Sequence, residues 1–193
     1  MTFIPKILAF AGSTRTGSWN KKLIRIAVAS AKAAGGDVTL IDLRDFPLPL
    51  YDGDLESDQG LPANAMKLKD LFLAHHGFLI SAPEYNSSIT GVLKNVIDWV
   101  SRPAPNEVDL ICFTNKFAGL MSASPGGLGG LRGLVTLRSI LGNIGTHVLP
   151  LQQAISKAHE AFNEDGTLKD SKQQKAVDKI AAGLVHIVQK FHS

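Results

Sequence analysis

The 193-residue sequence contains a single cysteine, Cys112, and only 7% of its residues are aromatic. One cysteine excludes an internal disulfide framework and any metal site built from several cysteines. No apolar run approaches the roughly 20 residues that a membrane-spanning helix needs, and the N-terminus lacks the basic and long apolar regions of a signal peptide. These absences predict a soluble cytoplasmic protein without membrane insertion.

Neither sign of charge predominates. The chain carries 20 basic and 17 acidic residues, spread along its whole length, for a formal net charge of +3. The pI near 9.0 therefore does not reflect a concentrated basic patch, and nucleic acid is not an expected partner. The six histidines show no metal-ligand spacing, so we expect no metal site.

Length and patterning predict one domain over residues 1–193, because a chain of this size with 45% hydrophobic residues builds one sizeable core. Five short apolar runs, bounded by Gly, Pro or Asp, are typical of buried strands. Between them, apolar residues three and four positions apart predict helices. The predicted strands are Lys6–Ala11, Val38–Asp42, Gly77–Ala82, Phe117–Ala123 and Gly145–Leu149.

The alternation of strand and helix predicts an open α/β fold, in which right-handed crossovers build a parallel sheet covered on both faces. Ligands of such sheets bind outside the carboxyl ends of the strands, where the strand order reverses. Three segments interrupt the alternation, and the first is long enough to be a site-lining loop or a surface between subunits. These segments are Leu43–Pro62, Arg102–Lys116 and Pro150–Lys169.

The segment GSTRTGSWN, from Gly12 to Asn20, directly follows the first predicted strand. If the next helix begins at Ser18 or Asn20, backbone N–H groups and the positive end of a helix dipole lie beside the strand end and attract an anion. The hydroxyls of Ser13 and Ser18 and the guanidinium of Arg15 add donors. Neither GxGxxG nor a Walker loop is present, which favours a statically held monophosphate. The alternative is a polar turn in which Ser18 caps the helix.

A second polar cluster follows the third predicted strand. Pro83 would end that strand, so that Glu84, Tyr85 and Asn86 project into the same crevice. Backbone amides there could bind the edge of a flat heterocycle while Tyr85 borders its face. The alternative is turn chemistry with helix capping by Asn86 or by one of the two serines that follow it.

A third cluster, Ser122–Gly133, follows the fourth predicted strand and contains five glycines. Glycines allow a close backbone approach to a ligand and leave N–H groups to face a developing negative charge. A flexible loop is the alternative. In the sheet order 2-1-3-4-5, strands one and three flank the reversal and strand four lies next to three, so the three clusters would converge on one site.

At these residues the sequence resembles the NADPH-dependent FMN reductase family, flavodoxin-like enzymes that include quinone, chromate and azo-dye reductases. The family pattern GSxRxxSxN is matched between Gly12 and Asn20, and PEYNxSxxGxLKNxxDW is matched in full from Pro83 to Trp99. The match extends through Ser124–Gly127 and covers most of the chain. The resemblance implies a flavodoxin-like three-layer sandwich with a five-stranded parallel sheet of order 2-1-3-4-5.

The resemblance also implies a bound FMN whose phosphate lies in the first motif and whose isoalloxazine lies between the second and third. Because the flavin carries the chemistry, no catalytic nucleophile or general base is expected. The segment Asn106–Lys116 departs from the family, which more often has a short loop before strand four. The implied FMN-binding residues are Ser13, Arg15, Ser18, Trp19, Asn20, Pro83, Glu84, Tyr85, Asn86, Ser124, Pro125, Gly126 and Gly127.

The implied activity is that of an NAD(P)H-dependent oxidoreductase. Hydride passes from NADPH or NADH to FMN and on to a small-molecule acceptor such as a quinone, an azo compound, a metal oxyanion or a free flavin. The alternatives are a flavodoxin-type electron carrier without nicotinamide turnover and a nucleotide-binding domain without flavin. Carriers resemble strongly acidic proteins, whereas this chain is +3.

The family is typically dimeric or tetrameric, with the helix after the second motif in the interface. We therefore expect a homodimer or homotetramer. Four residues of this chain match positions on that helix, so residues that pattern as helix core could partly belong to an interface. They are Leu93, Lys94, Ile97 and Trp99.

Overall fold

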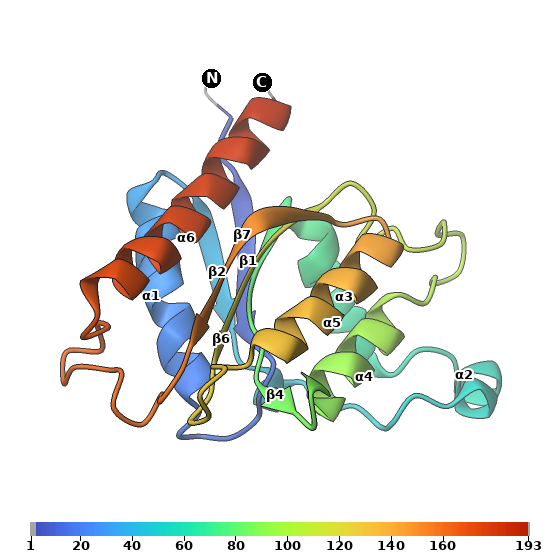
Figure 1. Ribbon diagram of the computed structural model, residues 1–193. Coiled ribbons are helices and arrows are strands. Elements are labelled where there is room, and N and C mark those ends of the chain that lie inside the picture. The colour runs from blue at the N-terminus through green and yellow to red at the C-terminus, as the bar shows by residue number, and fades with distance from the viewer. Residues whose placement is uncertain (1–2, 193) are drawn as a thin grey trace.

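The computed structural model describes residues 3–192, which form a three-layer α/β sandwich around a five-stranded parallel sheet (Figure 1). The strands lie in the order β2-β1-β3-β6-β7, which is 2-1-3-4-5 when the strands of this sheet are numbered along the chain. The predicted fold class and strand order are thus confirmed. The strands are β1 (Lys6–Ala11), β2 (Asp37–Ile41), β3 (Gly77–Ser81), β6 (Phe117–Ala123) and β7 (His147–Ile155).

The last strand is longer than its apolar pattern predicts. The sequence predicts Gly145–Leu149, with an irregular segment from Pro150 onward, whereas β7 continues through Pro150 to Ile155. Proline is tolerated there because β7 is an edge strand that pairs only with β6 within the sheet, and because its ladder shifts register between the pairs Ala118–Val148 and Leu120–Gln152. The prediction that Pro150 ends the regular structure is therefore wrong.

Helices cover both faces of the sheet, as the apolar stripes predict (Figure 1). Two helices pack on one face in a single hydrophobic cluster with β1, β6 and β7, and three pack on the other. Each large aliphatic side chain buried in this way contributes about 1.5–3 kcal/mol. The first pair is α1 (Trp19–Ala33) and α6 (Ser171–Phe191), and the other three are α3 (Ala63–Ala74), α4 (Gly91–Val100) and α5 (Leu131–Asn143).

Most of the matched residues on α4 belong to the core of this chain. Leu93, Ile97 and Trp99 are buried, whereas Lys94 lies on the surface and pairs with Asp98 one helical turn later, at 2.8 Å. The indole Nε1 of Trp99 donates a 2.8 Å hydrogen bond to a backbone carbonyl of the segment that precedes α2. Their apolar periodicity therefore reflects packing within one chain.

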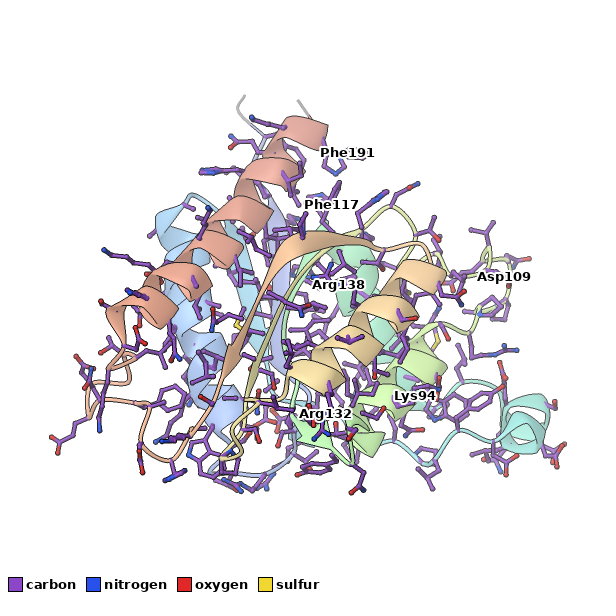
Figure 2. The ribbon with its side chains drawn as sticks, viewed as in Figure 1. Lys94, Asp109, Phe117, Arg132, Arg138 and Phe191 are labelled. Atoms are coloured by element: carbon purple, nitrogen blue, oxygen red, sulfur yellow. The ribbon has the colours of Figure 1, made fainter. Side chains whose placement is uncertain are left out.

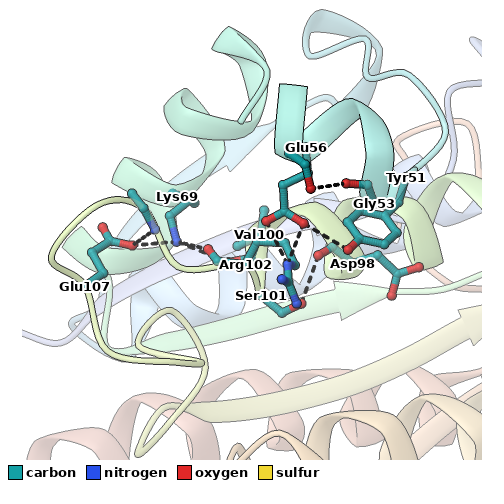
Figure 3. A network of polar contacts seen from close by, with 11 residues as sticks. Tyr51, Gly53, Glu56, Lys69, Asp98, Val100, Ser101, Arg102 and Glu107 are labelled. Atoms are coloured by element: carbon teal, nitrogen blue, oxygen red, sulfur yellow. Dashed lines mark hydrogen bonds and ion pairs between the residues drawn. The ribbon is translucent and has the colours of Figure 1, made fainter. Parts of the chain in front are cut away.

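The segment Leu43–Pro62 contains the 3₁₀ turn Leu43–Asp45 and the short helix α2 (Gly53–Gln59), which lies beyond α4 at the edge of the molecule (Figure 1). Figure 3 shows how it is attached: the Glu56 carboxylate accepts from the Tyr51 hydroxyl and from Arg102 Nε, both at 2.9 Å.

The segment before β6 is anchored by a buried lysine. Lys69 of α3 forms an ion pair with Glu107 at 2.8 Å and donates to the carbonyl of Arg102 at 2.6 Å (Figure 3). Cys112 lies beside Lys69, with 3.7 Å between Sγ and Nζ, and burial raises the pKa of its thiol. Although Asn106–Lys116 departs from the family pattern, β6 begins at Phe117 as predicted.

One buried amide joins the carboxyl ends of neighbouring strands. Asn20, which is 2% exposed, donates from Nδ2 to the carbonyl of Ala123 at 2.8 Å. Its Oδ1 accepts from the Ala123 N–H at 3.0 Å and from the Ser81 hydroxyl at 2.8 Å. Because Ser81 ends β3 and Ala123 ends β6, the start of α1 is fixed to both strands.

A second side chain fixes the end of β1. Thr90 caps α4 by accepting from the Leu93 N–H at 3.2 Å, and its hydroxyl donates to the Gly12 carbonyl at 2.7 Å. A Cβ at residue 12 would lie 2.9 Å from Leu93 Cδ2, so glycine is what allows α4 to approach the strand end this closely. Together, the hydrogen bonds of Asn20 and Thr90 form a frame that fixes the positions of the loops at this edge of the sheet.

Replacement of Asn20 tests that frame. Asn20→Ala leaves the Ser81 hydroxyl and the Ala123 backbone groups buried without partners, so we expect the free energy of unfolding to fall by about 2–4 kcal/mol. Urea denaturation measures it. As a matched control, Asn64→Ala removes a half-buried amide whose hydrogen bonds join it to the Pro47 carbonyl and to Lys67, both near the surface, and should cost less than about 1 kcal/mol. Equal losses in the two variants would contradict this role for Asn20.

Candidate functional site

A hollow at the carboxyl ends of β1, β3 and β6 brings the three sequence clusters together. It encloses about 380 Å³, including its solvent-open mouth. Asn86, Gly126 and Gly127 are the predicted site residues that are not part of its wall, and Ala123 lines it although the sequence analysis did not select it. The lining residues are Ser13, Arg15, Ser18, Trp19, Asn20, Pro83, Glu84, Tyr85, Ala123, Ser124 and Pro125.

The first loop ends in a helix N-terminus that has no side-chain cap. Ser18 occupies the N-cap position of α1, yet its hydroxyl makes no capping hydrogen bond. The first N–H groups of any α-helix lack partners inside the helix and attract an anion. Ser18 is 5% exposed and Ser13 6% exposed, and both line the hollow. The alternative in which Ser18 merely caps the helix is therefore wrong.

Arg15 places a positive charge on this loop without a neighbouring carboxylate to neutralise it. Its Nη2 donates to the Gly17 carbonyl at 2.8 Å, and its guanidinium stacks over the Trp19 ring, 4.8 Å from the ring centroid. Within residues 3–192 it forms no ion pair with a carboxylate. Arg44 braces the same loop from the β2 side, because its Nε donates to the carbonyl of Thr14 at 2.8 Å.

A neighbouring basic residue is already neutralised. Lys21, one position after Asn20, pairs with Asp42 at 2.5 Å. Burial raises the pKa of Asp42, but the hydrogen bonds from Lys21 and from the Arg44 N–H outweigh it and hold that pKa below its usual value. Asp42 therefore stays ionised and keeps Lys21 paired, whereas Arg15 and Arg44 both contact the first loop through backbone carbonyls.

The second cluster forms a β-hairpin. β4 (Glu84–Tyr85) and β5 (Ser88–Ile89) pair antiparallel across Asn86 and Ser87, which have φ values of 52° and 66°. Two consecutive left-handed residues are typical of the two-residue turns that join adjacent strands, and asparagine tolerates this conformation well.

The hairpin changes the interpretation of this cluster. Asn86 is exposed at the turn, away from the hollow, whereas Tyr85 lines the hollow with 58% of its side chain exposed. Asn86 lies in the turn of the hairpin. Capping by Asn86 or the serines is wrong, because Thr90 caps α4. The sequence analysis missed the hairpin, although the dipeptide Asn86-Ser87 was a signal for it.

The third cluster contributes its first residues to the hollow. Ser124 Oγ accepts from the Gly126 N–H at 3.3 Å, which turns the chain directly after Ser124 and Pro125. Gly129 and Gly130 have φ values of 62° and 93°. A Cβ at Gly129 would lie 2.7 Å from the backbone of Ile155, so this glycine serves the close packing of the loop against β7.

The lining of the hollow is made mainly of hydrogen-bond donors and aromatic rings. Its lining contains neither histidine nor cysteine. Over residues 3–192 no group of three or more His, Cys, Asp or Glu side chains is arranged to hold a metal ion. No helix in this part of the chain is long and apolar enough to cross a membrane. Hydroxyls, an arginine and a helix N-terminus at one end, with a tyrosine nearby, suit a phosphorylated ligand that carries a flat ring system.

Comparison with known proteins identifies relatives that cover most of the chain. A "Probable NADPH:quinone oxidoreductase 2" from rice is 36% identical over 170 residues, covering 86% of this chain and 79% of the rice protein. An NAD(P)H-dependent FMN reductase from Pseudomonas aeruginosa is 33% identical over 175 residues, or 90% of each chain. Among solved structures, the flavoenzyme NAD(P)H:(acceptor) oxidoreductase FerB from Paracoccus denitrificans superposes with a TM-score of 0.80 at 29% identity, covering 97% of this chain and 98% of that one.

The fold has wider relatives. An archaeal flavodoxin, 9% identical, superposes with a TM-score of 0.61 over 95% of this chain and 98% of its own, which shows a shared fold alone. The model of the NADPH-dependent FMN reductase family matches residues 5–160, which include all three loops of the hollow. The chain is therefore a member of the NADPH-dependent FMN reductase family of oxidoreductases.

Proposed function

We propose that the hollow binds FMN and that the protein uses it to oxidise NADPH or NADH and to reduce a small-molecule acceptor. One observation carries the proposal: the family's first motif places three anion-binding features at one end of the hollow. They are the N-terminus of α1, the Ser18 hydroxyl, which makes no capping hydrogen bond, and the guanidinium of Arg15, which pairs with no carboxylate of residues 3–192. Bound there, FMN would supply two-electron chemistry, taking hydride from the nicotinamide and passing electrons to the acceptor.

The chain's own residues bind and orient the cofactor. Ser13, Arg15 and Ser18 hold the phosphate: the two serines are buried hydroxyl donors, and Arg15 adds a positive charge. Tyr85 borders the ring, while Ser124 and its neighbours approach the opposite edge. Because Pro125 has no N–H and the Gly126 N–H donates to Ser124 Oγ, the backbone N–H of Gly127 is the one suited to stabilising negative charge that develops on the ring during reduction.

Asn20 has a different role in this proposal. Its Oδ1 accepts two hydrogen bonds and its Nδ2 donates one, all to the strand ends. It therefore holds the frame of the site, although the family resemblance groups it with the phosphate ligands. Asn86 and Gly126 shape the turns beside the hollow.

A quinone is the acceptor class that we propose first. Several relatives are named as quinone reductases, among them proteins of rice, potato and Escherichia coli. The hollow opens to solvent, and an exposed tyrosine at its rim suits a flat acceptor. Azo compounds, metal oxyanions and free flavin are further candidates, because an open flavin face admits many oxidants.

We further propose a cytoplasmic homodimer or homotetramer. Because most of the matched α4 residues are buried within one chain, we propose that the contact between subunits lies on the segments beside α4. Two large apolar side chains are exposed there, Leu50 at 79% and Val108 at 68%. Size-exclusion chromatography with light scattering measures the assembly, and a monomer at micromolar concentration would contradict it. The single, buried Cys112 suits a reducing compartment.

Nicotinamide turnover separates the enzyme from an electron carrier. We expect the purified protein with FMN to show a flavin spectrum that bleaches on addition of NADPH and recovers when a quinone is added. A bound flavin that stays oxidised under both NADPH and NADH would favour the carrier. A protein whose thermal stability does not respond to FMN would contradict flavin binding altogether.

Replacement of Arg15 tests the phosphate assignment. Arg15→Ala removes a charge-assisted contact of about 1.5–3 kcal/mol, so the Kd for FMN should rise by roughly tenfold to a hundredfold in a fluorescence titration. Riboflavin, which lacks the phosphate, should bind the variant and the wild type equally. Arg25→Ala removes an exposed arginine of α1 and serves as the control. Loss of affinity for riboflavin as well would contradict the assignment.

Replacement of Tyr85 tests the ring-facing wall. Tyr85→Ala should change kcat and the range of quinones accepted, with a much smaller effect on FMN retention, because the side chain borders the open face. Tyr85→Phe keeps the ring and should behave like the wild type. Identical steady-state kinetics for Tyr85→Ala and the wild type would show that Tyr85 faces away from the reacting groups.

A further inference from the structure

The carboxylate of Glu84 is held by α5 at the edge of the hollow. Its Oε2 accepts from the Gly133 N–H at 3.0 Å, and its Oε1 accepts from Arg132 Nε at 3.1 Å. Arg132 Nη2 also lies 3.1 Å from Oε1, so the pair is a salt bridge. The Glu84 side chain is only 10% exposed. Figure 2 shows Arg132 at the start of α5, beside the hairpin. Both carboxylate oxygens are therefore engaged within the protein.

The helix that receives this carboxylate has no cap of its own. The N-cap residue of α5 is Gly130, at φ 93°, and it offers no side chain. The unpaired N–H groups and the positive dipole end of a helix favour an acceptor with negative charge at this position. Glu84 supplies it from 49 residues earlier in the chain. The hairpin and the helix thus stabilise each other.

The backbone geometry shows how closely the two elements approach. A Cβ at Gly133 would lie 3.2 Å from Glu84 Cβ and 3.2 Å from the Ser88 carbonyl oxygen. Both strands of the hairpin therefore rest directly on α5, and glycine at residue 133 permits it. A hairpin of two short strands is only marginally stable alone, so its position depends on such a support.

We propose that Glu84 is a positioning residue whose contact with Arg132 and Gly133 latches the hairpin to α5 and so fixes Tyr85 at the wall of the hollow. The flavin-binding part of this inference rests on the proposed function. The latch itself is a property of the protein without ligand. Glu84 contributes to cofactor binding by holding the backbone of the hairpin, and its carboxylate makes no direct contact with the flavin.

Hydrogen exchange of the protein without FMN tests the latch. Glu84→Ala should raise amide exchange in residues 84–89 and at the start of α5, while exchange in β1, β3 and β6 stays as in the wild type. Glu160→Ala is the matched control, because Glu160 is exposed and its carboxylate pairs with the adjacent His159. Unchanged exchange in residues 84–89 of Glu84→Ala would overturn the proposal.

FMN titration tests the consequence for the site. Glu84→Ala should raise the Kd for FMN roughly tenfold, the scale set by losing a charge-assisted contact. Arg132→Gln should raise it by a smaller factor, and Arg132→Lys, which keeps the positive charge, should restore most of the affinity. Because both side chains act through one contact, the double variant Glu84→Ala/Arg132→Gln should bind FMN no more weakly than Glu84→Ala.

The outcomes separate the latch from its alternatives. Weaker FMN binding in Glu84→Ala without faster hairpin exchange would show that the carboxylate contacts the flavin directly, and would overturn the proposal. Additive losses in the double variant would overturn it too, because the two residues would then act independently. If the wild type does not bind FMN, the proposed function fails, whereas the exchange experiment still decides whether the latch exists.

Discussion

The site depends on the hydrogen bonds of one buried amide. Asn20 connects the first turn of α1 to Ser81 at the end of β3 and to both backbone groups of Ala123 at the end of β6. Parallel strands end at one edge of a sheet but do not by themselves fix the loops that follow them. Because a buried amide with unpaired groups is costly, these contacts hold the three loops in one relative position.

Within this frame, polar side chains divide into two groups. Asn20, Thr90 and Glu84 have partners inside the protein and hold the backbone in place. The Ser18 hydroxyl makes no capping hydrogen bond at the start of α1, and the Arg15 guanidinium beside it contacts only a backbone carbonyl and the Trp19 ring. Donors that the fold does not pair with a carboxylate at a helix N-terminus are available to an anionic ligand.

Local patterns predict well wherever a residue's role depends on its near neighbours. The apolar run Phe117–Ala123 was sufficient to define β6, because a strand buried on both faces is apolar throughout. β7 was predicted too short because proline ordinarily ends a strand, and only its edge position and the register shift beside β6 make Pro150 acceptable. The hairpin after Pro83 was missed because its strands are too short for periodicity to reveal.

The sequence by itself determined the fold class, the strand order through the family motifs, and three loops rich in hydroxyls, amides and glycines at one sheet edge. Spacing and residue type suffice for the alternation of elements and for the loops because these arise from contacts within a few residues, whereas the strand order follows from the family resemblance. Only the tertiary structure decided that Asn20 faces the strand ends and that Glu84 faces α5. Their partners lie 103 and 49 residues away in the chain, and no local pattern encodes contacts over that separation.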